Sequence, residues 1–199
     1  MQIRSEETQA HIKAAAISAF SQSGFDAASV ADICGRAGVS KGAFYHHFPS
    51  KQDLFLVIME DWLRGIDSLL FSKTESGVSV PRRIAEMGNK MGIIFQAASG
   101  QLPMFMEFMV QASRDATVWN AVIAPYRRFQ QQFAALLEQG VQEGSIQPDA
   151  DVEQAAHALI SLAVGILLQG VVDPRAADWK GVTNAGVAMI IDGITRGEG

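Results

Sequence analysis

Residues 29–48, SVADICGRAGVSKGAFYHHF, constrain the fold of this chain more than any other stretch. Apolar side chains recur there at the spacing of one face of an α-helix, at Val30, Ile33, Cys34 and Ala37. Ser29 and Asp32 stand where a capping-box pair would begin this helix, and Gly38 stands where a left-handed residue would end it. The pattern therefore predicts a short helix that stops at a tight turn.

A second short helix is predicted directly after the turn. Ser40 can cap it, and Phe44 and Phe48 lie four residues apart on one side of it. Two helices joined by a glycine-containing turn form the helix-turn-helix unit, whose second helix can enter the major groove of DNA. Similar hairpins also occur as plain packing units, so these twenty residues alone leave both roles open.

The side of the second helix opposite the two phenylalanines is polar. Gly42 and His46 point away from the rings, and Lys41 and Tyr45 lie on the flank. An ammonium, a phenol, an imidazole and a position without a side chain can bind phosphates, approach base edges or stack on a sugar. This composition favours a DNA-contacting face over the alternative, an ordinary solvated helix surface.

Residues 38–55, GVSKGAFYHHFPSKQDLF, resemble the recognition-helix signature of the TetR (TetR/AcrR) family of bacterial repressors. Residues 11–40 resemble the N-terminal run of the same family, so the resemblance covers about the first sixty residues. It implies a three-helix DNA-binding domain at residues 1–52 and a helical ligand-binding and dimerisation domain at 53–199. Many members have a threonine pair where this chain has Ala28-Ser29, and a serine hydroxyl can make the same phosphate contact.

The resemblance implies a ligand-responsive regulator, most simply a repressor, that binds a pseudo-palindromic operator as a homodimer and is released by a small, largely apolar effector. An activator and a nucleoid-type DNA-binding protein are the nearest alternatives. We assign the phosphate and base contacts to Ser29, Ser40, Lys41, Gly42, Tyr45, His46 and Lys51. The recognition helix has no arginine or asparagine for bidentate base readout, so specificity should depend on half-site spacing and DNA shape.

Charge and composition agree with a protein that touches DNA at one end. The net charge is −5, but residues 1–52 carry five Lys/Arg and four acidic residues, for a charge of +1, and the remainder carries −6. Cys34 is the only cysteine, which excludes an intrachain disulfide. No signal-peptide pattern is present, and the longest apolar run, 158–168, is short for a membrane span, so we expect a cytoplasmic protein.

The rest of the chain has helical periodicity and no alternating strand pattern. Helices are predicted at about 5–23, 50–72, 81–99, 102–113, 115–143, 151–172 and 178–195, in addition to the two of the hairpin. The fold class is therefore all-α, with about nine helices.

Methionine and aromatic side chains are concentrated on the three helices between residues 81 and 143. We assign effector contacts to Met87, Met91, Phe95, Phe105, Phe108, Met109, Trp119 and Tyr126. Methionine is soft and unbranched, so such a lining would accept varied apolar ligands, although an ordinary core has the same composition. Glu107 interrupts the apolar run MFMEFM and could face a cationic ligand or lie at the rim of the site.

The last two helices are apolar on most sides and contain Gly165, Gly170, Gly186 and Gly193. Such glycines permit close helix packing, either within one subunit or across the four-helix dimer interface that the family resemblance implies. No phosphate-binding loop, nucleophile elbow or HExxH motif is present, and His46-His47 has no partner at metal-ligand spacing. We therefore expect no enzyme activity, cofactor or metal site. A small-molecule-binding or enzymatic helical protein with a purely structural hairpin is the rival from another class.

Overall fold

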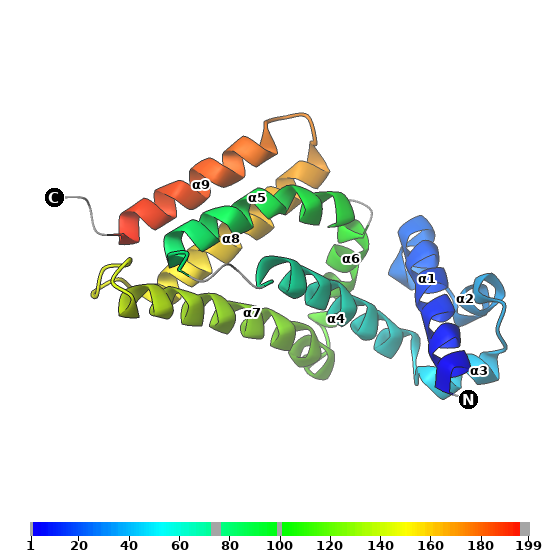
Figure 1. Ribbon diagram of the computed structural model, residues 1–199. Coiled ribbons are helices and arrows are strands. Elements are labelled where there is room, and N and C mark those ends of the chain that lie inside the picture. Colours follow the sequence, from blue (N-terminus) through cyan, green and yellow to red (C-terminus); the bar gives the residue numbers. More distant parts are fainter. Residues whose placement is uncertain (1, 73–76, 99–100, 196–199) are drawn as a thin grey trace. The chain divides into compact units, whose positions relative to one another are not determined.

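The computed structural model describes residues 2–72, 77–98 and 101–195, and within these ranges it contains nine helices and no strand (Figure 1). The helices are α1 (Gln2–Ala27), α2 (Val30–Ala37), α3 (Lys41–His47), α4 (Lys51–Leu70), α5 (Val80–Ala98), α6 (Leu102–Ala112), α7 (Ala116–Gln142), α8 (Val152–Val172) and α9 (Trp179–Ile194). The predicted all-α class is confirmed, and the predicted ends of most helices differ from these by only a few residues.

The largest difference lies at the end of the first helix. Gly24 has φ +79° and ψ 164°, which breaks the helix, and a further helical turn follows as far as Ala27. Glycine is suited to this backbone because a side chain at positive φ is sterically disfavoured. The sequence predicted that the helix would end at this glycine but did not predict the extra turn.

The helices divide into two units by packing. The first contains Met1–Gly65 and Gly100–Ile123, and the second contains Ile66–Ser99 and Ala124–Gly199. Helices α1, α2, α3 and α6 thus lie in the first unit, and α5, α8 and α9 lie in the second, whereas α4 and α7 each contribute residues to both. The predicted boundary after residue 52 divides the chain by function and stays a prediction; by packing, α6 belongs with the N-terminal helices.

The core of the first unit is aromatic. Phe20, Phe25, Phe55 and Phe108 are all buried, with Phe55 stacked on Phe108 at a centroid distance of 3.9 Å and Phe25 edge-on to Phe108 at 4.9 Å. Trp62 of α4 stacks on Phe105 of α6 at 4.8 Å. Burial of side chains of this size is a large stabilising contribution, so α6 and the N-terminal helices share one core.

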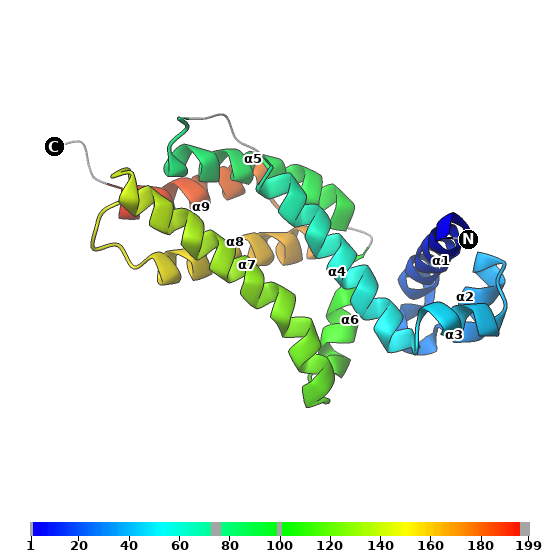
Figure 2. The ribbon, with the colours of Figure 1, turned by 60° about the horizontal axis from the view of Figure 1, so that its bottom comes forward.

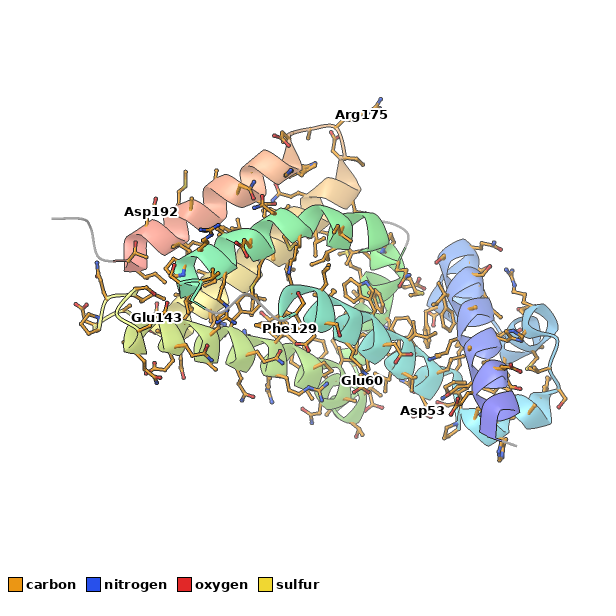
Figure 3. All side chains as sticks on the ribbon, viewed as in Figure 1. Asp53, Glu60, Phe129, Glu143, Arg175 and Asp192 are labelled. Atoms are coloured by element: carbon orange, nitrogen blue, oxygen red, sulfur yellow. The ribbon has the colours of Figure 1, made fainter. Side chains whose placement is uncertain are left out.

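In the second unit α5, α8 and α9 run side by side (Figures 1 and 2). Glu143, labelled in Figure 3 at the end of α7, accepts a hydrogen bond from the Val80 N–H at 2.7 Å and so caps the start of α5. Phe129, also labelled, packs its ring against Phe133 and Phe71. Helix α8 is long and apolar enough to cross a membrane by length and composition alone, a property that core helices of soluble proteins share.

Candidate DNA-binding site

The two helices of the hairpin begin and end as the sequence predicts. Ser29 and Asp32 form a capping box, in which the Asp32 N–H donates to Ser29 Oγ at 3.1 Å and the Ser29 N–H donates to Asp32 Oδ2 at 3.2 Å. Gly38 ends α2 in the left-handed conformation, with φ +68°. Ser40 Oγ accepts from the Ala43 N–H at 3.1 Å and caps α3. Each turn of the hairpin is therefore fixed by local hydrogen bonds.

Buried side chains fix the orientation of α3. Phe44 and Phe48 are buried in the core of the first unit, together with Ile33 and Cys34 of α2. Because these rings hold one side of α3 inward, the opposite side is held toward solvent.

The solvent-facing side of α3 carries the residues that the sequence assigns to DNA. Lys41, Gly42, Tyr45 and His46 are all exposed, and the Tyr45 side chain is 54% exposed. A Cβ atom added at Gly42 would meet only Ser40 Oγ, at 3.8 Å, so the packing of the chain itself does not require glycine there. The structure thus brings these four residues together on one exposed surface of α3.

Ser29 and Ser40 are the N-caps of α2 and α3, so their hydroxyl groups already take part in hydrogen bonds. Ser29 Oγ donates to Asp32 Oδ2 at 2.6 Å, so its hydroxyl proton is used within the cap. Ser40 uses its hydroxyl oxygen as an acceptor, which leaves the proton able to reach a phosphate. The role of both serines in DNA binding stays a prediction.

The Lys51 ammonium lies over the end of α1. It donates to the carbonyl oxygens of Phe25, Asp26 and Ala28 at 2.6, 3.2 and 2.9 Å, and it lies 4.4 Å from the centroid of the Phe25 ring. The pKa of Lys51 is lowered, because burial disfavours the charged ammonium. The charges of Asp26 and Glu107 act in the opposite direction but do not cancel this effect. All three N–H donors are used, so the predicted phosphate contact would require exchange of one of these carbonyls.

Glu107 of α6 binds the same end of α1. Its carboxylate accepts from the Phe25 N–H at 3.1 Å and from the Asp26 N–H at 3.4 Å. A Cβ atom on Gly24 would lie 2.8 Å from Glu107 Oε2, so the glycine also makes room for the carboxylate. This contact is not predicted from the sequence, in which the only signal is a glycine helix end followed by N–H groups without helical partners.

The residues assigned to the effector are divided between the two units. Phe105 and Phe108 are buried in the core of the first unit, and Met109 and Trp119 pack against that core. Met87 is buried in the second unit, where Met91 and Tyr126 are partly buried. Phe95 lies on α5, but its side chain lies outside the described residues.

Metal chemistry has no support in the part of the chain that the structure describes, because no group of three His, Cys, Asp or Glu side chains there could hold an ion. His46 and His47 lie with their ring centroids 5.2 Å apart.

Comparison with known families accounts for most of the chain. Residues 12–58 match the family of bacterial regulatory proteins called the tetR family, and residues 96–192 match the C-terminal domain of BetI-type transcriptional repressors. The chain belongs to the TetR family. TetR-family proteins are DNA-binding transcription regulators and not enzymes, so the predicted family and function are confirmed.

Individual TetR-family proteins are similar over nearly the whole chain. The HTH-type transcriptional regulator UidR of Escherichia coli K12 is 27% identical over 168 residues, which are 84% of this chain and 83% of UidR. The structure of Salmonella enterica GusR has a TM-score of 0.75 at 23% identity and covers 93% of this chain and 95% of GusR. A transcriptional regulator of Saccharomonospora viridis in complex with choline has a TM-score of 0.77 at 17% identity, covering 96% of this chain and 100% of that one.

Proposed function

We propose that the protein is a cytoplasmic repressor that binds a pseudo-palindromic operator as a homodimer and releases it when a small effector binds. The observation that carries the proposal is the surface of α3: Lys41, Tyr45 and His46 are exposed while Phe44 and Phe48 anchor the helix in the core. The family match to BetI-type transcriptional repressors supports the sign of regulation.

In this proposal α3 lies in the major groove. Lys41 and Ser40 contact phosphates, Tyr45 and His46 reach sugars or base edges, and Gly42 lets the helix backbone approach the DNA closely. The two copies of α3 in a dimer would occupy half-sites about 34–36 Å apart, or a multiple of that distance. With no arginine in α3, sequence recognition relies on half-site spacing and DNA shape.

Helices α8 and α9 supply the proposed dimer surface. Their exposed large apolar side chains are Val164, Leu168, Val172, Val182 and Met189. A Cβ atom on Gly165 or Gly193 would meet nothing within 4 Å in the subunit, whereas one on Gly186 would lie 2.7 Å from Leu162 Cδ2. Gly186 therefore allows close packing within the subunit, whereas Gly165 and Gly193 leave space that a helix of the partner subunit could occupy.

The effector is proposed to contact α6 and the start of α7, through Phe105, Met109 and Trp119 among the assigned residues. A ligand that displaces this part of the chain would shift α4 and change the separation of the two copies of α3. An allosteric coupling of about 1–3 kcal/mol would weaken operator binding by about 5–150-fold. The similar regulator with bound choline makes choline a reasonable first compound to test.

A footprint on the promoter beside the gene for this protein tests the proposal. Wild-type protein should protect a pseudo-palindromic site, and the double variant Lys41→Ala/Tyr45→Ala should lose protection while staying folded and dimeric. Glu138→Gln, an exposed change on α7, is the matched control and should protect like wild type. A wild-type protein that protects no DNA at low salt would support the rival class of helical protein with a structural hairpin.

The same promoter distinguishes a repressor from an activator or a nucleoid-type protein. A repressor should lower transcription of a reporter, and a compound that binds should restore it. Mass spectrometry of small molecules that co-purify with the protein, run beside choline, would supply that compound. If a bound compound left operator affinity unchanged at fixed salt, the release mechanism would be wrong.

A further inference from the structure

The turn formed by residues 25–28, which is the end of α1 and the residue after it, is held by charged side chains of two other helices. Glu107 of α6 accepts the N–H groups of Phe25 and Asp26, and Lys51 of α4 donates to the carbonyls of Phe25, Asp26 and Ala28. Opposite charges thus bind the two ends of one peptide group, the C=O of Phe25 and the N–H of Asp26, and also hold its neighbours. Such charge-assisted hydrogen bonds are roughly twice as strong as neutral ones.

We propose that Glu107 is a positioning residue that couples α6 to the DNA-binding hairpin through this turn. The turn leads directly into Ser29, the N-cap of α2, and α2 packs with α3 in one core. A displacement of Glu107 would therefore move the start of α2 and, through it, the exposed surface of α3. The proposal rests on the DNA-binding function proposed above.

The local backbone is suited to a carboxylate at this point. The break at Gly24 restarts the helix, so the N–H groups that follow have no helical partner of their own. Two oxygens of one carboxylate satisfy two neighbouring N–H groups, and the missing Cβ of Gly24 leaves room for them. An amide in place of the carboxylate would present an NH₂ group to one of the two donors.

Helix α6 can transmit a displacement because the rings beside Glu107 pack closely against α4. Phe108 stacks on Phe55, and Phe105 stacks on Trp62. Phe105 and Phe108 lie on either side of Glu107 in the sequence of α6. A ligand that displaces either ring would therefore also displace the Glu107 carboxylate. By thermodynamic linkage, DNA binding to α3 must in turn change the environment of α6.

Trp62 fluorescence measures this linkage without an identified effector. A parent protein with Trp119→Phe and Trp179→Phe retains Trp62 as its single tryptophan, stacked on Phe105. The probe is the promoter fragment that contains the protected site. The measured quantities are operator affinity, the change of Trp62 emission at saturating DNA, and the thermal midpoint. Glu107→Gln is compared with the control Glu138→Gln in this background.

The parent and Glu138→Gln should show the same DNA-dependent change of emission. Glu107→Gln should bind the fragment more weakly, by about fivefold or more, and should lose most of the emission change even when saturated with DNA. A residue with only a structural role would lower the thermal midpoint and leave the emission change at saturation intact, which would overturn the proposal.

The remaining outcomes are also decisive. A parent that binds the fragment without any change of Trp62 emission overturns the coupling but leaves the DNA-binding function standing. Wild-type protein that binds no promoter fragment contradicts the proposed function itself. If Glu107→Gln shows no cooperative unfolding, Glu107→Asp, which keeps the charge but withdraws the oxygens, takes its place. An unchanged emission response in that variant overturns the proposal.

Discussion

The Ser29 hydroxyl and the Asp32 carboxylate bond each other across the first turn of α2, with Ser29 Oγ donating to Asp32 Oδ2 at 2.6 Å. The backbone N–H of each residue also donates to the side chain of the other. This pair begins the hairpin that carries the DNA-contacting surface. Its hydrogen bonds lower the pKa of Asp32 below the ordinary value for an aspartate, with a smaller contribution from the charge of Arg36.

The lowered pKa of Asp32 predicts a pH dependence of stability. Since the folded pKa lies below the unfolded value of about 3.9, the contribution is complete at pH values above the unfolded pKa and is lost as the pH falls through the folded pKa. Urea unfolding of wild type and Asp32→Asn between pH 6 and pH 3 measures it. The difference in unfolding free energy between the two proteins should shrink as the pH falls. A constant difference would contradict the assigned hydrogen bonds.

Gly24 and Gly35 should respond to alanine in opposite directions. Gly24→Ala places a Cβ atom 2.8 Å from Glu107 Oε2 at a residue with φ +79°, so we expect destabilisation by more than about 1 kcal/mol. Gly35 lies within α2 with nothing within 4 Å of an added Cβ, and Gly35→Ala should stabilise the protein by about 0.5–1 kcal/mol. Chemical denaturation of both variants gives the two values. Equal effects would mean that the turn at residue 24 tolerates a side chain.

The hairpin could be predicted from the sequence because its determinants are local. The caps at Ser29 and Ser40 and the left-handed Gly38 each act within a few residues, so their identity and spacing suffice. The contacts of Lys51 and Glu107 join residues that lie 23 to 82 positions apart, and no local pattern specifies such a pairing. For the same reason the sequence suggests a ligand contact or a rim position for Glu107 and does not indicate its contact with the end of α1.

Phe108 should stabilise the DNA-binding helices, although it lies far from them in the sequence. It is buried against Phe25 and Phe55, so Phe108→Ala should cost about 3–5 kcal/mol. For the same reason a fragment ending at residue 52, which lacks Phe55 and Phe108, should show little cooperative unfolding by circular dichroism. The full chain with Val110→Ala, an exposed change on the same helix, is the control and should unfold like wild type. A stable, cooperatively folded fragment would support a separate domain at residues 1–52.

A charged side chain on the proposed dimer surface of α8 and α9 should prevent dimerisation. Val172 and Met189 are 77% and 74% exposed, so a charge at either position should leave the folded subunit almost unchanged. In a dimer through α8 and α9 the same charge would be buried without a partner, which is costly. Val172→Asp and Met189→Glu should therefore shift the protein from dimer to monomer in sedimentation velocity at micromolar concentration. Val110→Asp places the same charge on an exposed valine of α6 and should remain dimeric. Dimers that persist in both α8–α9 variants would show that the subunits associate through another surface.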